Sequence, residues 1–150
     1  MADNLKENIV AFLSKNPFLH LATVDQNGHP MVHDVAYVSK GESVYFATNK
    51  QTRKAQNIAK QGKIAYTVGT PGDDWSKITT LQMEGCAKLV TDEKEIDEIH
   101  QMLVTKFPPM KNMPKNPEDG FFKITHSQGF ILDYSKGFGH RDKVEFKGCC

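Results

Sequence analysis

The chain has no long apolar run, little net charge and few cysteines. No apolar stretch approaches the roughly 18 uninterrupted residues that span a bilayer, so we expect no membrane partner. The 19 basic and 18 acidic residues leave a net charge of +1, which gives no extended field to attract nucleic acid. The three cysteines include no C-x-x-C pair, which favours reduced thiols over a disulfide framework. Any site for an anion must therefore be local.

Signals for export are missing as well. Residues 1–16 have no basic start, no unbroken apolar segment and no small-residue cleavage site, which predicts a cytoplasmic protein. The length of 150 residues, with 39% apolar and 25% charged side chains, is typical of one globular domain. No internal repeat divides the chain, so we expect a single domain over residues 1–150.

Apolar residues at helical spacing predict three helices. The first covers residues 3–15 and ends where Asn16 precedes a proline. The second covers residues 52–61 and is followed by Gly62, a typical residue after a helix end. The third covers residues 92–107 and begins with an aspartate followed three residues later by a glutamate, the capping-box spacing.

Stretches rich in β-formers occupy most of the remaining chain, and short polar turns join them. Gly85 lies inside one such stretch and is expected at a bulge or a close backbone approach. Strands joined by turns rather than crossover helices indicate a mainly β, α+β fold, an antiparallel barrel with peripheral helices. The predicted strands are residues 18–24, 31–39, 43–48, 63–69 and 77–90, then 121–135 as a strand pair or one bent strand, followed by a tail.

Two adjacent cations stand at the start of the predicted second helix. Thr52 is the expected cap, so the free amides of the first turn point out beside Thr48, Arg53 and Lys54. Cations are unfavourable at the positive end of a helix dipole unless an anion binds there. The pattern predicts a phosphate-binding site, and an ordinary solvated helix face is the alternative.

Such a phosphate site would bind only weakly by itself. Charged hydrogen bonds contribute about 1.5–3 kcal/mol each before ordering costs, whereas micromolar affinity needs about 8 kcal/mol. The remainder must come from burial of an apolar or aromatic part of the ligand. The expected ligand is therefore a flat aromatic molecule with a terminal phosphate, and flavin mononucleotide (FMN) and pyridoxal phosphate are both candidates.

Other chemical signals are weaker. His29 and His33 are four residues apart but lie across a turn and a strand, so they do not form the usual helical metal pair, and we expect no metal site. Residues 137–142, GFGHRD, lack the third glycine of a dinucleotide-binding motif. Cys86 in a strand is interpreted as a small buried side chain. No catalytic residue can be assigned from these patterns.

The chain resembles the pyridoxamine 5'-phosphate oxidase-like, flavin-binding split-barrel family. The similarity lies in the order of a helix, FLHLATVDQNGHPMVHDVAYV, SVYFATNKQTRKAQNIAKQGKIAYTV, and LQMEGCAKLV followed by a helix, over roughly residues 5–107. Its most specific part is Thr48-Asn49 followed by Arg53-Lys54 at a helix start, which is similar to the family's flavin phosphate motif.

The resemblance implies a split barrel that forms a homodimer, with two FMN molecules at the subunit interface. The threonines and cations at the helix start would hold the phosphate, and the backbone of residues 32–35 would line the ring. The implied cofactor-binding residues are Thr48, Lys50, Thr52, Arg53, Lys54, Val32, His33, Asp34, Val35 and Gln82.

The resemblance leaves the substrate open. In the true oxidase, an arginine and a lysine of the second strand serve the flavin and the vitamin, and Val32 and Tyr37 occupy those places here. We therefore expect an FMN-dependent oxidoreductase that acts on another, unidentified small molecule or electron donor. Candidate neighbours of the ring or substrate are His33, Tyr37, Trp75, Gln82 and His140.

Two alternatives stand beside this expectation. Some split-barrel relatives bind haem through a histidine near the C-terminus, which would be His140 here. A flavin store or sensor without turnover is the non-enzymatic alternative.

Overall fold

The computed structural model describes residues 2–69, 71–114 and 116–148 as one antiparallel sheet with helices around it. The helices are α1 (Ala2–Lys15), α2 (Arg53–Lys60) and α3 (Glu93–Lys106), and the short 3-10 turns are η1 (Trp75–Lys77), η2 (Pro108–Asn112) and η3 (Tyr134–Lys136). The strands are β1 (Phe18–Val24), β2 (Pro30–Ala36), β3 (Val38–Lys40), β4 (Ser43–Asn49), β5 (Lys63–Val68), β6 (Thr79–Leu89), β7 (Asp119–Asp133) and β8 (Arg141–Glu145).

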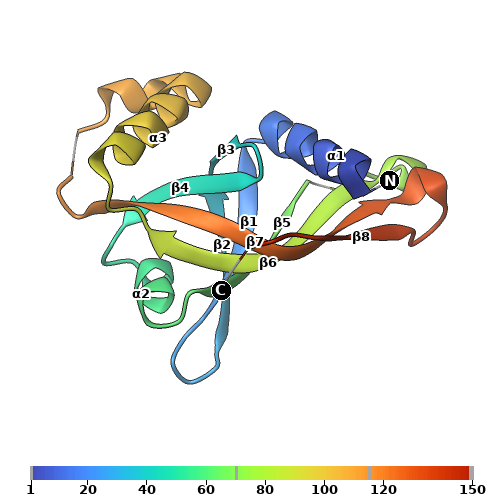
Figure 1. Ribbon diagram of the computed structural model, residues 1–150, viewed down its shortest axis with the longest axis horizontal. Helices are drawn as coiled ribbons and strands as arrows, with labels where there is room; N and C mark the ends of the chain where they lie inside the picture. Colours follow the sequence, from blue (N-terminus) through green and yellow to red (C-terminus); the bar gives the residue numbers. More distant parts are fainter. Residues whose placement is uncertain (1, 70, 115, 149–150) are drawn as a thin grey trace.

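The sheet curls until its two ends meet. The strands follow the order β2-β1-β5-β6-β7-β4-β3, and β8 pairs with β7 outside this path. β2 and β3 stand at opposite ends of this order, yet only Tyr37 separates them in the chain. The sheet must therefore close on itself at this residue, and the curled ribbon of Figure 1 is the expected split barrel.

Tyr37 fixes this closure from inside. Its side chain is fully buried, and its Oη donates a hydrogen bond of 2.6 Å to the Leu13 carbonyl. Its backbone N–H donates to the Pro17 carbonyl at 3.3 Å. The Lys106 ammonium lies 4.0 Å from the ring centroid and donates to the Asn16 carbonyl at 2.6 Å. Because burial raises the pKa of Tyr37, the phenol keeps its proton as a donor.

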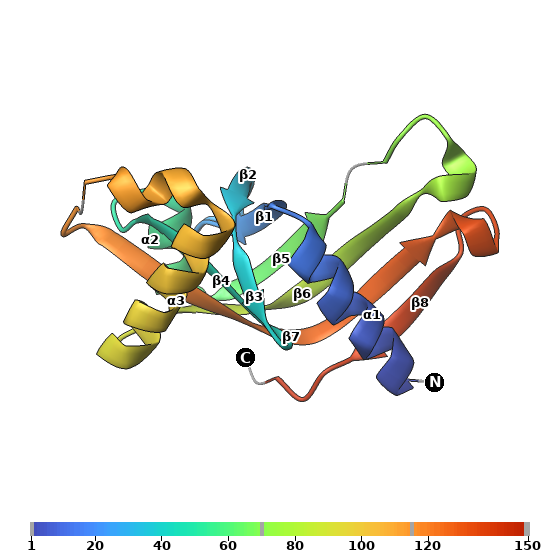
Figure 2. The same cartoon turned by 90° about the horizontal axis from the view of Figure 1, so that it is seen from above.

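Two clusters of buried side chains fill the fold. The larger lies inside the barrel, and the smaller lies between α3 and the outer side of β3 and β4. Neighbours on β4 divide between them, with Phe46 in the first cluster and Tyr45 in the second, as strand alternation requires. In Figure 1, α1 and α3 lie above the sheet and α2 lies below it, and Figure 2 shows α1 crossing towards β8. None of the described helices is both long and apolar enough to cross a bilayer.

The pairing of β6 with β7 contains one spare residue. Glu84 pairs with Gln128 and Gly85 pairs with His126, so Ser127 stands opposite no residue of β6 in the strand register. This arrangement is a β-bulge, which bends a strand and increases its twist. The bulge lies beside the glycine at which the sequence predicted an irregularity.

The bulge also explains why position 85 is glycine. A Cβ added to Gly85 would lie only 2.0 Å from the Thr125 carbonyl oxygen, so no larger residue fits without a backbone shift. On β7, the buried positions are even-numbered up to His126 and odd-numbered from Gly129. The expectations of a bulge and of a close backbone approach at Gly85 are both confirmed.

Most other expected elements are confirmed, with three differences. Residues 31–39 form two strands rather than one, because the chain turns at Tyr37. For residues 121–135 the sequence allows either a strand pair or one bent strand, and the structure has the single bulged strand β7. The expected tail contains β8, which pairs with β7.

The expectation of reduced thiols is wrong for one cysteine. Cys86 is buried, as the sequence predicts, but it is disulfide-bonded. Cys149 and Cys150 lie outside the described residues.

A titratable side chain is buried in β7. His126 is 3% exposed, and its Nε2 shares a 2.6 Å hydrogen bond with the Tyr66 hydroxyl. Its Nδ1 has no hydrogen-bond partner among the residues that the structure describes. Burial lowers the pKa of His126 to about 4, and the backbone of Glu42 opposes this only in part. His126 is therefore neutral at pH 7.

We expect the free energy of unfolding to fall as the pH drops below 6.5. The pKa of His126 is about 4 in the folded protein, against 6.5 as its ordinary value, so the unfolded chain takes up a proton first. The contribution of His126 to the free energy of unfolding is fully present above its pKa in the unfolded chain. It is lost as the pH falls towards its pKa in the folded protein. A difference of about 2.5 pKa units corresponds to roughly 3 kcal/mol.

Urea unfolding at pH 7 and pH 4.5 measures this loss. The loss should be smaller in a folded His126→Gln variant, because glutamine does not titrate. An equal pH dependence in the variant would assign the effect to other groups.

Candidate functional site

A capped turn leads from β4 into α2. Thr52 Oγ1 accepts a hydrogen bond from the Ala55 N–H at 3.4 Å and donates one to the Asn49 carbonyl at 2.8 Å. Asn49 Oδ1 accepts a hydrogen bond from the Gln51 N–H at 2.8 Å. Thr48 Oγ1 lies 3.4 Å from Thr52 Oγ1. The predicted helix cap at Thr52 is confirmed, and it places both hydroxyl groups at the start of α2.

A buried asparagine anchors α2 to the barrel. Asn57 is 8% exposed, and its Nδ2 donates to Thr23 Oγ1 at 3.1 Å and lies 3.4 Å from Met31 Sδ. Ala55 and Ile58 of the same helix are buried in the larger cluster inside the barrel, which we call the main core. Because Thr23 belongs to β1 and Met31 to β2, these contacts hold the helix against both strands.

The first turn of α2 concentrates positive charge. It contains Arg53 and Lys54 and no acidic residue, and neither cation is paired with a carboxylate in the described part of the chain. The Gln56 N–H makes the first backbone hydrogen bond of the helix, to the Thr52 carbonyl at 3.0 Å. The two amides of Arg53 and Lys54 precede this bond and have no acceptor among the described residues. Burial lowers the pKa of Lys54.

His33 brings β2 to the same place. Its Nδ1 is shielded from solvent but has no hydrogen-bond partner within the described ranges. Burial lowers the pKa of His33, and the charges of Lys54 and Arg53 lower it further. The imidazole is therefore neutral beside two cations. We call the group Thr48, Thr52, Arg53, Lys54 and His33 the α2 cradle.

The α2 cradle has the chemistry of an anion site. Its two cations, its two open helix amides and the Thr48 hydroxyl can donate hydrogen bonds, and no carboxylate of the described residues neutralises the cations. A phosphate would supply the missing counter-charge and acceptors. The residues present therefore fit the phosphate end of FMN.

Other predicted cofactor residues lie away from the α2 cradle. Val32 and Gln82 line a pocket of about 420 Å³ on the outer face of the sheet. Phe130 and Arg141 line it too, and the guanidinium lies 4.4 Å from the centroid of the ring. Lys50 lines a different pocket, between α2 and β6.

The remaining predicted residues of β2 divide between surface and core. Asp34 is exposed, and its Oδ1 lies 2.6 Å from the Nδ1 of His20. Val35 is 5% exposed and belongs to the main core. Tyr37 is part of the barrel closure, so its side chain presents no surface to a ring or substrate.

Two further candidates lie at the end of the molecule opposite α2, where Figure 2 shows η1 and η3 together. Trp75 is 59% exposed and stacks on Phe138, with 5.3 Å between ring centroids. His140 Nε2 lies 3.1 Å from Asp142 Oδ2. Within one chain, these side chains do not meet the α2 cradle.

The role of Asn57 was not predicted from the sequence. The expected apolar stripe of α2 consists of Ala55, Ile58 and Ala59. In the structure Ala59 is exposed, and Asn57 is buried in its place. Its partner Thr23 is 34 residues away in the chain, so no local pattern marks the contact. A polar residue between two apolar helix positions was the sole available signal.

A family model described as pyridoxamine 5'-phosphate oxidase matches residues 5–132. The chain belongs to this family. No protein of curated function matches the chain in sequence. Membership in the pyridoxamine 5'-phosphate oxidase family confirms the resemblance inferred from the helix-start motif and the order of the strands.

Similar solved structures share the fold of this pyridoxamine 5'-phosphate oxidase family member. General Stress Protein 26 of Bacillus anthracis is 20% identical, with a TM-score of 0.71 over 95% of this chain and 99% of that one. HutZ, the haem storage protein of Vibrio cholerae, is 19% identical, with a TM-score of 0.73 over 85% and 94%. A haem-binding protein of Mycobacterium smegmatis is 14% identical, with a TM-score of 0.78 over 97% and 58%. At these identities the likeness shows the fold alone.

We expect the double variant Arg53→Ala/Lys54→Ala to raise the pKa of His33. Both cations lower this pKa, so their removal should move it towards its ordinary value, while burial, the larger cause, keeps it below that value. A titration of the imidazole signals by NMR, with the His33 signal assigned from a His33→Gln variant, measures the change. Lys60→Ala, at the other end of α2, is the control and should leave the pKa of His33 unchanged. An unchanged pKa in the double variant would show that Arg53 and Lys54 do not act on His33.

Proposed function

We propose that this protein is a homodimeric FMN-binding oxidoreductase that holds the flavin phosphate in the α2 cradle. One observation carries the proposal: the start of α2 has two cations without a carboxylate partner and two open helix amides, and these cations act on the pKa of His33, whose Nδ1 lacks a partner among the described residues. Family membership supports the same assignment.

The backbone of β2 is suited to contact the flavin ring. β2 stands at the end of the strand order and pairs with β1 on one edge. Every second backbone N–H and C=O group of residues 32–35 therefore points away from β1 and can bond to a ligand. Since His33 also belongs to the α2 cradle, a molecule bound at the phosphate site can reach this edge.

A second copy of the chain would complete the ring site. Val32 is 68% exposed and Phe18 of the adjacent β1 is 51% exposed, so large apolar side chains lie open on these two strands. Val32 and Gln82 line the same outer pocket. A partner subunit would cover these side chains in the homodimer that the family resemblance implies.

The division of chemistry follows from this arrangement. FMN, when bound, supplies electron transfer between a donor and an acceptor. The chain itself would neutralise the phosphate with Arg53 and Lys54, orient the ring through β2, and offer the uncharged His33 Nδ1 as a hydrogen-bonding group. The small-molecule substrate stays unidentified, and the cytoplasmic location stays a prediction from the sequence.

Haem binding is the second candidate. HutZ is named a haem storage protein and the Mycobacterium smegmatis protein a haem-binding protein. The carboxylates of haem are anions, so the α2 cradle could hold them as well. His140, the ligand expected for haem, directly precedes β8, and Figure 2 shows β8 at the end of the molecule away from α2, so this histidine would have to act across a dimer.

The absorption spectrum of the purified protein should show the blue and near-ultraviolet bands of flavin. Haem would instead give one intense Soret band and would replace the first candidate by the second. Mass spectrometry of the extracted compound should give the mass of FMN. Reduction of the bound flavin by a nicotinamide, followed by rapid transfer to an acceptor, should then distinguish the oxidoreductase from a flavin store or sensor.

We expect Arg53→Ala/Lys54→Ala to weaken FMN binding by about 10²- to 10⁴-fold, because two charged hydrogen bonds of about 1.5–3 kcal/mol each are lost. The fold should persist, since neither side chain is part of the core. Fluorescence titration of the apoprotein with FMN measures the affinity. Lys60→Ala removes a cation from the last turn of α2 and should bind FMN as the original protein does. Equal affinity in the folded double variant would contradict the assignment of the phosphate to the α2 cradle.

A further inference from the structure

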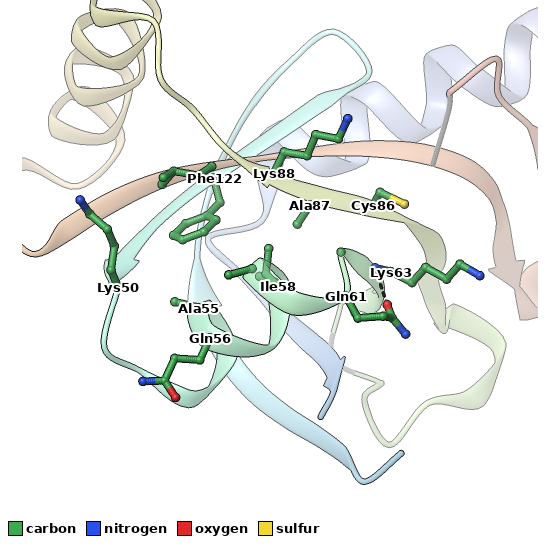
Figure 3. Close-up of a pocket in the computed structure, with 13 residues that line it drawn as sticks. Lys50, Ala55, Gln56, Ile58, Gln61, Lys63, Cys86, Ala87, Lys88 and Phe122 are labelled. Carbon is green, nitrogen blue, oxygen red and sulfur yellow. Dashed lines mark hydrogen bonds between the residues drawn. The ribbon is translucent and has the colours of Figure 1, made fainter. Parts of the chain in front are cut away.

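A second pocket lies between α2 and β6, shown in Figure 3. Its volume is about 660 Å³, within the range of small-molecule sites. Neither His33 nor the two cations of the α2 cradle line it. The lining residues are Lys50, Ala55, Gln56, Ile58, Ala59, Gln61, Gly62, Lys63, Cys86, Ala87, Lys88, Leu89 and Phe122.

The floor of the pocket is apolar. Ala55, Ile58, Ala87 and Phe122 line it, and none of the four is more than 5% exposed. Leu89 at its edge, the last residue of β6, is an apolar side chain that is 44% exposed. A hydrocarbon group in the pocket would leave water for this apolar floor and would cover Leu89, which is favourable.

The rim of the pocket carries charge of one sign. Lys50, Lys63 and Lys88 are exposed, and their ammonium groups stand around the opening in Figure 3, pointing away from the floor. Gln56 and Gln61 add polar groups, and no carboxylate is part of the described lining. None of the three lysines pairs with a carboxylate of the described residues. In a chain with 19 basic and 18 acidic residues, this local excess favours an anion.

We propose that this pocket binds a small amphipathic anion, a hydrocarbon chain that ends in a carboxylate. The hydrocarbon chain of the ligand would lie over Leu89 and Phe122, and its carboxylate would contact the lysines at the mouth of the pocket. An inorganic anion could not use the apolar floor, and a cation would be repelled by the rim. The proposal does not require FMN at the α2 cradle, because the two sites share no cation.

Calorimetric titration of the purified protein with octanoate, decanoate and dodecanoate, each below its micelle concentration, tests this proposal. Affinity should rise about fourfold for each added methylene, the fold-change that corresponds to its burial. Decyltrimethylammonium, with the same chain and the opposite charge, should bind at least tenfold more weakly than decanoate. Amide NMR shifts on adding decanoate should centre on Ile58, Leu89 and Phe122.

Two variants test where decanoate binds. Ala59→Phe puts a bulky group at an exposed lining position of α2, and Lys63→Gln/Lys88→Gln removes two rim charges; each should weaken decanoate binding at least tenfold. Lys60→Gln/Lys94→Gln removes the same charge at exposed positions outside the pocket and should have no effect. Circular dichroism checks that all variants are folded.

Several results would overturn the proposal. These are the absence of decanoate binding, equal affinity for the cationic probe, or unchanged affinity in both pocket variants. A change of oligomeric state in Lys63→Gln/Lys88→Gln would make this surface an interface between copies of the chain. Loss of decanoate binding in Arg53→Ala/Lys54→Ala alone would place the probe at the α2 cradle, and this result would leave the proposed FMN function intact.

Discussion

Closure of the sheet at Tyr37 is the constraint on which the candidate site depends. β2 and β3 belong to opposite ends of the strand order, and one residue joins them, so the position of β2 is set by the closure and not by a flexible loop. The buried bond from Tyr37 to the Leu13 carbonyl holds the closed form. β2 then presents His33 to the start of α2, where Arg53 and Lys54 act on its pKa.

The charge at the α2 cradle is held in place by packing elsewhere. A helix of eight residues is marginal alone, and cations in its first turn oppose its dipole. The hydrogen bond from Asn57 to Thr23 and the burial of Ala55 and Ile58 offset this disadvantage. The barrel thus maintains a locally unfavourable concentration of positive charge, which an anion would relieve.

Features with local signals could be predicted from the sequence, and contacts between distant segments could not. The cap at Thr52 and the irregularity at Gly85 follow from residue type and spacing. The break at Tyr37 does not, because the apolar alternation continues through it and only closure imposes the turn. Asn57 is buried by a partner on another strand. At the candidate site, the sequence located the two cations. The family resemblance put His33 at the flavin ring, and its place near the cations depends on the closed barrel.

The spare residue in β7 has a consequence for the shape of the sheet. If Ser127 were removed, inward and outward positions would alternate along β7 without a break. The inward even-numbered positions, which end at His126, would be followed by the inward odd-numbered positions, which begin at Gly129, so the same side chains would point inward as now. The insertion therefore turns no side chain over. What it supplies is curvature, which lets a single strand of 15 residues leave the barrel wall and continue into the arm formed with β6 and β8. Shortening the chain by this one residue would straighten that arm and leave the interior composition of the strand as it is.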